Sequence, residues 1–300
     1  MNPDTVMKIG VILPSVEVQR TQNLDLAAAA RHAEQAGLDG VWHGDHLAVG
    51  MPTLDGPIAL AVAAAATGRI TIGASVLVPA IRPLAWAVKQ VASLQYVSGG
   101  RLILGVGSGG GPAQWAAAGV AYAERGRRTD AALELLPKLL AGDRVRLTGE
   151  PGQPEIEPTP AVTPPPIWVG NASAVALRRA ARLGDGWFPS LVSPQEVAAG
   201  AGRLAGLAAR RPVPVIAIGA AGALGPGVPA REEIASGIAQ AYGRPLEQVL
   251  PIPITGDPGQ AAERVAAYHD AGARHLVMGI SGGDWRHQCD LLAETRALLA

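Results

Sequence analysis

An aspartate and a histidine stand side by side, as Asp45-His46, directly after a short apolar run at 40–43. A histidine titrates near neutral pH and can hold or transfer a proton, and a neighbouring carboxylate can orient the ring or support its charged form. His43 is expected in the wall of the same pocket, and Trp42 in the hydrophobic core. The pair therefore predicts general acid–base chemistry, with the plain alternative that His46 only caps the next element.

Small residues gather where two further apolar runs end. The first group is Gly107, Ser108 and Gly109, and the second is Gly170, Asn171, Ala172 and Ser173. Glycine just past the carboxyl end of a strand lets the backbone approach a flat or phosphorylated ligand closely. Backbone N–H groups at a helix start, together with a serine hydroxyl, suit a phosphate, although Ser173 is equally suited to be a simple helix N-cap.

Other chemistries find little support in the sequence. His43, Asp45 and His46 suggest a metal site, but no second cluster of histidine or acidic residues at ligand spacing accompanies them, so no metal is expected. There is no GxSxG elbow for acyl transfer. The single cysteine, Cys289, excludes an internal disulfide and is expected as a small buried residue in the last helix.

The composition narrows the class of protein. Hydrophobic residues make up 48% and charged residues 17% of the 300 residues, which predicts a soluble globular protein. Lys+Arg and Asp+Glu are both 25, so no basic surplus exists to neutralise phosphates, and nucleic acid is not an expected partner. The first residues lack the pattern of a signal peptide, and no apolar stretch is long enough to span a bilayer. We therefore expect a cytoplasmic protein without a membrane partner.

The elements that must position these residues alternate along the chain. Apolar runs predict strands at 8–13, 40–43, 70–78, 102–106, 167–170, 186–188, 213–219 and 275–279, each followed by an amphipathic helix. Eight such repeats predict a (β/α)8 TIM barrel, with a doubly wound open sheet as the rival. A Pro/Gly-rich insertion at 142–166, between strands 4 and 5, is expected as an irregular excursion or a short hairpin. The barrel is expected to form a single domain over 7–300, with 1–6 as a flexible N-terminus.

Several stretches of the sequence carry a family resemblance. They are GLDGVWHGDHL at 37–47, the run from IGASVLVPAIRP to GVGSG at 72–109, AERGRR at 123–128, PPIWVGNASAVALRRAARLGDGW at 165–187 and YHDAGARHLVMG at 268–279. Together they resemble the bacterial-luciferase-like superfamily, whose members are flavin- or deazaflavin-dependent oxidoreductases with a (β/α)8 barrel. The family holds monooxygenases that use reduced FMN, hydride-transfer enzymes that use the deazaflavin coenzyme F420, and some relatives that bind flavin without turnover.

The resemblance implies roles for particular residues. The run ASVLVPAIRP looks most like the deazaflavin-dependent branch, so F420 is the expected cofactor and FMN the alternative. It implies a bulge with a cis peptide bond between Ser75 and Val76 that backs the middle ring of the cofactor. His46 would lie beside the reactive ring atom with Asp45 as its support. The groups at 107–109 and 170–173 would bind the rest of the cofactor.

One position departs from the family pattern. Deazaflavin-dependent sugar-phosphate dehydrogenases carry an acid where this chain has Gly110, and Glu17 is only a weak substitute. The departure favours another small organic substrate, through reduction of a C=C or C=N bond or oxidation of an alcohol. The resemblance also implies a homodimer and a separate reductase for the cofactor. Arg178 and Arg179, further along the helix after 173, could approach a phosphate, although most such arginines are solvated.

Overall fold

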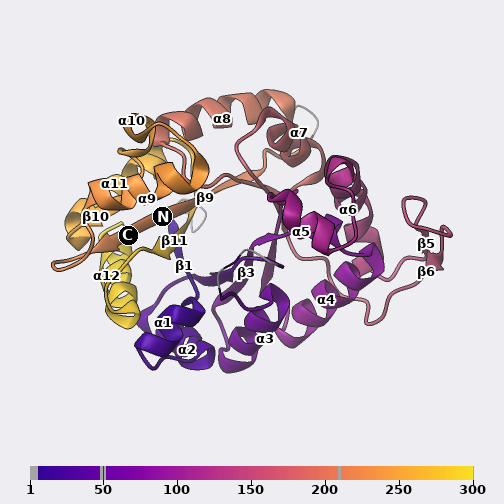
Figure 1. Ribbon diagram of the computed structural model, residues 1–300, viewed down its shortest axis with the longest axis horizontal. Helices are drawn as coiled ribbons and strands as arrows, with labels where there is room; N and C mark the ends of the chain where they lie inside the picture. The colour runs from indigo at the N-terminus through magenta and orange to yellow at the C-terminus, as the bar shows by residue number, and fades with distance from the viewer. Residues whose placement is uncertain (1–5, 48–49, 51, 209–210, 300) are drawn as a thin grey trace.

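Parallel strands close into a barrel in the computed structural model, which describes residues 6–47, 50, 52–208 and 211–299 (Figure 1). The ring consists of β1 (Lys8–Ile12), β2 (Gly40–His43), β3 (Thr71–Leu77), β4 (Leu102–Val106), β7 (Ile167–Gly170), β8 (Gly186–Phe188), β9 (Val215–Leu224) and β11 (His275–Ile280). Pairing of β8 with β9 closes it. The predicted (β/α)8 barrel is confirmed, whereas residues 1–5 of the expected flexible N-terminus lie outside the described residues.

Helices surround the barrel (Figure 1). The longer ones are α2 (Leu26–Ala36), α3 (Gly56–Ala66), α4 (Leu84–Val97), α6 (Arg125–Leu140), α7 (Ala174–Leu183), α8 (Pro194–Leu207), α9 (Arg231–Tyr242), α11 (Pro258–Asp270) and α12 (Trp285–Ala297). The short ones are α1 (Val16–Thr21), η2 (Pro79–Ile81), α5 (Pro112–Ala117), η3 (Tyr122–Glu124) and α10 (Leu246–Val249). Within the described residues, no helix combines the length and apolar character needed to cross a membrane.

The insertion between β4 and β7 forms a small hairpin, as the sequence predicted. Strands β5 (Val145–Arg146) and β6 (Glu155–Ile156) pair antiparallel and project away from the barrel (Figure 1). The sequence did not predict β10 (Ile254–Gly256), which pairs with β9 outside the ring, and it ended β9 five residues early, at 219 rather than Leu224. Gly222 permits this pairing, because a Cβ there would lie 1.9 Å from the Ile254 carbonyl oxygen.

Aromatic side chains fill the barrel interior below its mouth. Trp42 and Trp168 stack with ring centroids 5.4 Å apart, and Phe188 packs against both. The indole of Trp42 lies directly over Gly73, where a Cβ would come within 2.1 Å of the ring. The expected core position of Trp42 is thus confirmed, and the buried site expected for Cys289 is confirmed as well. These rings form a solid base, so any ligand site must lie above them, at the rim.

Candidate active site

Four neighbouring strands end side by side on one arc of the barrel rim. The sheet order places β2, β3, β4 and β7 next to one another and parallel, so the loops that follow them leave from the same edge. The catalytic and cofactor-binding residues that the sequence predicts, at 45–46, 75–76, 107–109 and 170–173, belong to these strand ends or to the loops after them. The carboxyl edge is where (β/α)8 enzymes build their active sites.

The Asp45 carboxylate is fixed between the loops after β2 and β3. Arg82 Nη2 lies 2.8 Å from Oδ1 and 2.7 Å from Oδ2, and the Val78 backbone N–H donates to Oδ2 at 2.9 Å. The aspartate side chain is 7% exposed and that of Arg82 is 18% exposed, so this ion pair is largely shielded from water. The expected support of His46 by Asp45 stays a prediction. In the structure, Asp45 joins the loop after β2 to the loop after β3.

His46 is exposed at the rim beside the end of β3. A Cβ added at Gly44 would lie 3.2 Å from His46 Nε2 and 3.5 Å from the Ser75 carbonyl oxygen, so Gly44 makes room between the two. Exposure leaves the imidazole accessible to a bound molecule. This accessibility suits a group that exchanges a proton with a ligand.

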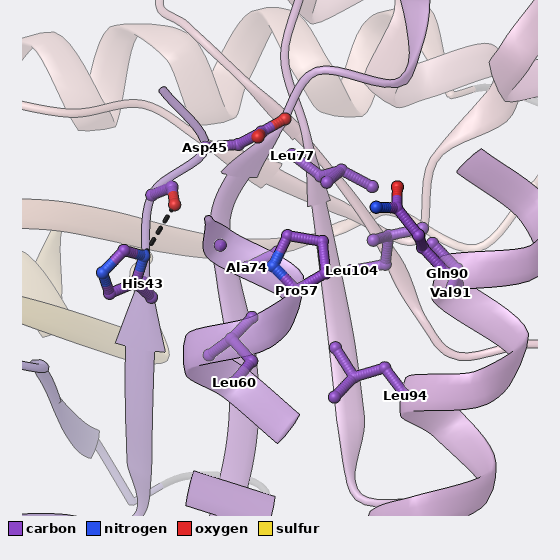
Figure 2. Close-up of a pocket in the computed structure, with 12 residues that line it drawn as sticks. His43, Asp45, Pro57, Leu60, Ala74, Leu77, Gln90, Val91, Leu94 and Leu104 are labelled. Atoms are coloured by element: carbon purple, nitrogen blue, oxygen red, sulfur yellow. Dashed lines mark hydrogen bonds between the residues drawn. The ribbon is translucent and has the colours of Figure 1, made fainter. Parts of the chain in front are cut away.

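His43 faces a different space from His46. Its side chain lines an apolar cavity between the barrel and helices α3 and α4, together with Leu60 and Leu94 (Figure 2). Nδ1 donates to the Gly44 carbonyl at 2.7 Å, which leaves Nε2 as the acceptor nitrogen of the neutral ring. Burial lowers the pKa of His43, so the ring stays neutral at physiological pH. His43 does line a pocket, as expected, but this pocket lies behind the rim.

The end of β3 carries the expected bulge. The Ser75-Val76 peptide bond is cis, and the register of β3 against β4 shifts between Ala74 and Leu77. The Val76 side chain then lies over the ends of β4 and β7. A Cβ at Gly107 would come within 2.5 Å of Val76 Cγ2, and one at Gly170 within 3.0 Å of Val76 Cγ1. These glycines therefore accommodate Val76, a role that the sequence pattern did not reveal.

The loop after β4 is held from two sides. The Gly107 N–H donates to the Leu77 carbonyl at 2.9 Å, and the Ser108 hydroxyl accepts from Arg179 Nη1 at 2.9 Å. Gly109 adopts φ +63°, a conformation that favours glycine, and packs against Val78. Gly110 is exposed with no heavy atom within 4 Å of an added Cβ. The position where the family resemblance led us to look for an acid is thus open space.

The turn after β7 presents polar groups to solvent. Asn171 has φ +85°, and its Oδ1 accepts from the Ser173 N–H at 2.8 Å. The Asn171 carbonyl accepts from Trp187 Nε1 at 2.9 Å, which ties the turn to β8. Ser173 caps α7 through the Ala176 N–H, so its N-cap role is confirmed, while its role toward a phosphate stays a prediction. Residues 171–173 are all exposed, so this helix start is open to an anion.

Three arginines behind the rim were not predicted in these roles. Arg82 holds Asp45, and Arg179 holds Ser108. Arg128 donates to the Ala80 and Arg82 carbonyls and pairs with Glu150 of the insertion. No described group of three or more His, Cys, Asp or Glu side chains is placed to hold a metal ion.

The chain is similar to known proteins in both sequence and fold. The profile of a family described as luciferase-like monooxygenase matches residues 7–224. An F420-dependent hydroxymycolic acid dehydrogenase of Mycobacterium tuberculosis is 35% identical over 193 residues, covering 60% of this chain and 52% of that protein. A 4-hydroxyprotoasukamycin monooxygenase of Streptomyces nodosus subsp. asukaensis is 35% identical over 116 residues, covering 38% and 31%.

The fold has close counterparts among solved structures. An F420-dependent secondary alcohol dehydrogenase superposes with a TM-score of 0.80 over 98% of this chain and 99% of its own, at 16% identity. At that identity the likeness concerns the fold alone. The chain spans about half the length of the curated relatives it matches, at 52% for the first of them.

Proposed function

The chain belongs to the luciferase-like monooxygenase family, and on that basis we propose that it transfers a hydride between deazaflavin coenzyme F420 and a small organic substrate. The observation that carries the proposal is the rim itself, where exposed His46 stands beside the cis-bulged end of β3 and the glycine-rich ends of β4 and β7. The F420-dependent relative at 35% identity supports this choice of cofactor.

The residues at the rim fit a flat, phosphorylated cofactor. The inward positions at the ends of β4 and β7 are Gly107 and Gly170, so Val76 is the side chain that forms the wall there. Ser108 offers a hydroxyl, and the exposed start of α7 at Ser173 offers backbone N–H groups to a phosphate. When bound, F420 supplies a ring carbon that gives or takes the hydride.

The proposed work of the protein is to hold the reactants and move one proton. Val76 supports the ring face, and residues 107–109 and 170–173 bind the remainder of the cofactor. His46 Nε2 holds or donates the proton that the reacting substrate atom needs. Asp45 keeps the loop of His46 against β3 through Arg82 and Val78, so the imidazole has a defined position.

The open position at Gly110 bears on the substrate. An acid there is absent, and Glu17 is exposed in α1, at the start of a helix outside the ring. His46 is then the proposed proton-transfer group. A reaction that needs one such group, such as reduction of a C=C or C=N bond or oxidation of an alcohol, fits this arrangement better than oxidation of a sugar phosphate.

A second candidate is an FMN-dependent monooxygenase, favoured by the monooxygenase relative. A third is a cofactor-binding protein without turnover, which the missing acid at Gly110 favours. Equilibrium titration of the purified protein with F420 and with FMN, followed by tryptophan fluorescence, separates the first two candidates, and a turnover assay separates both from the third. We expect F420 to bind at least tenfold more tightly, by about 1.4 kcal/mol. Tighter binding of FMN would overturn the choice of cofactor, and binding of neither would overturn the function.

We also propose a homodimer built on one helical face, within a single domain over 7–300. The neighbouring helices α3 and α4 both carry exposed apolar side chains, namely Ile58, Val62, Trp86 and Tyr96. Burial of such a patch against a second copy would remove it from water. Sedimentation of wild type and Trp86→Glu tests this, with a monomeric wild type as the contrary result. A separate reductase partner and a cytoplasmic location remain predictions.

A further inference from the structure

The contact between Arg179 and Ser108 has a direction that chemistry fixes. Arg179 Nη1 of α7 lies 2.9 Å from Ser108 Oγ in the loop after β4. A guanidinium can only donate hydrogen bonds, so the serine oxygen accepts. The hydroxyl proton of Ser108 must then point to a different acceptor. A hydroxyl held in this way is prepared to donate to an oxygen at the rim.

Arg179 is itself held firmly on its other side. Its Nε lies 2.6 Å from Asp130 Oδ1, and its Nη2 donates to the Gly126 carbonyl at 2.9 Å. The arginine side chain is 12% exposed, whereas that of Asp130 is 50% exposed, so the guanidinium lies inside the contact between α6 and α7. Most of its N–H groups are used in these bonds. It therefore has little capacity to grip a phosphate directly.

The bond from Arg179 to Ser108 restricts a loop that is rich in glycine. Ser108 stands between Gly107 and Gly109, and glycines lose more conformational entropy on ordering than any other residue. The bond from this largely shielded guanidinium fixes the Ser108 side chain against α7, 71 residues away in the sequence. The loop thus reaches a ligand with its hydroxyl already placed, which lowers the ordering cost of binding.

We propose that Arg179 is a positioning residue that makes Ser108 a hydrogen-bond donor to a carbonyl or phosphate oxygen of the bound cofactor. This inference rests on the proposed function, since it needs a cofactor at the rim. Arg179 then affects the affinity for the cofactor only by orienting the Ser108 hydroxyl. A purely structural arginine would join α6 to α7 and leave the affinity unchanged.

A double-mutant cycle on cofactor affinity tests the proposal. Ser108→Ala and Arg179→Met should each raise the F420 dissociation constant about tenfold, as expected for one lost hydrogen bond. The double variant should bind about as weakly as either single variant, because both changes remove one interaction. Arg182→Met, an exposed arginine of the same helix, is the control and should change affinity less than about twofold.

Two further measurements separate positioning from folding. Asp130→Asn removes the ion pair but keeps the Ser108 contact, so it should lower the Tm and leave the F420 affinity within about threefold. If Arg179→Met does not fold, Arg179→Lys replaces it, since one ammonium cannot serve Asp130 and Ser108 together. This inference alone would be overturned if the two tenfold losses multiplied to about a hundredfold in the double variant. Unchanged F420 affinity in a folded Arg179 variant would overturn it as well. A wild type that binds neither F420 nor FMN would overturn the proposed function and this inference with it.

Discussion

Replacing Asp45 with asparagine should destabilise the protein, because it breaks a shielded ion pair while keeping the side chain's shape. The carboxylate oxygens lie 2.8 and 2.7 Å from Arg82 Nη2, and Oδ2 also accepts the Val78 N–H at 2.9 Å. Asparagine retains one acceptor oxygen, but its amide group presents N–H donors where Arg82 or Val78 also presents a donor. The orientation that keeps the Val78 bond places the amide NH2 against Arg82 Nη2, so Arg82 loses one of its two contacts and the negative charge that it pairs with.

The size of the effect follows from burial. Hydrogen bonds to charged groups contribute about 1.5–3 kcal/mol, and breaking a fully buried pair costs about 3–5 kcal/mol. The Arg82 side chain is 18% exposed, so water replaces part of the loss. We expect a destabilisation of about 2–3 kcal/mol, which lowers the Tm of a domain of this size on the order of 5 °C.

Thermal melts of a double-mutant cycle provide the assay. Asp45→Asn, Arg82→Met and the double variant are compared with wild type, and the double variant should lose at least about 1 kcal/mol less than the sum of the singles. Turnover should fall in both single variants if Asp45 acts by fixing the loop of His46. Strictly additive melting shifts, or a turnover defect confined to Asp45→Asn, would refute this reasoning.

Three more predictions concern the rim and the barrel interior. Gly107→Ala should weaken cofactor binding and lower the Tm, because its Cβ would come within 2.5 Å of Val76 Cγ2. Gly110→Ala is the control and should have the Tm of wild type, because nothing lies within 4 Å of its Cβ. Equal Tm values for the two variants would contradict the close packing of Val76 on Gly107. His46→Ala should lower kcat about 10²–10⁴-fold with little change in cofactor affinity, and full turnover would remove its proton-transfer role. Burial lowers the pKa of His275 to about 4, so protonation favours the unfolded chain. The contribution of His275 to stability should be complete above about pH 6.5 and should be lost, by up to about 3 kcal/mol, as the pH drops toward 4. His275→Asn should reduce the slope of acid-unfolding curves in this range.

The strands of the barrel could be predicted because they are continuously apolar runs between turn residues. Runs such as 102–106 and 167–170 match β4 and β7 to the residue. By contrast, β10 has only three residues and pairs with β9 because Gly222 allows close approach of Ile254. Its residues follow Pro251 and Pro253 and form no continuous apolar run, so the local pattern does not reveal it.

The sequence indicated the loops of the candidate site but not the residues that hold those loops in place. Asp45, Ser108 and their neighbours stand at strand ends, where position along the chain is informative. Arg82 meets Asp45 across 37 residues, and Arg179 meets Ser108 across 71, so these pairings exist only once the barrel has closed. The fit of Val76 over Gly107 and Gly170 is likewise a product of neighbouring strands.

Anaerobic turnover with F420 is the most direct test of the proposed chemistry. Purified protein is mixed with oxidised F420 and a panel of alcohols, and with reduced F420 and compounds that carry C=C or C=N bonds, while the cofactor's absorbance is followed. We predict a substrate-dependent change in the redox state of F420 without oxygen, and its loss in His46→Ala. Oxygen consumption with reduced FMN, and no reaction of F420 with any substrate, would contradict hydride transfer by the deazaflavin and establish the monooxygenase alternative.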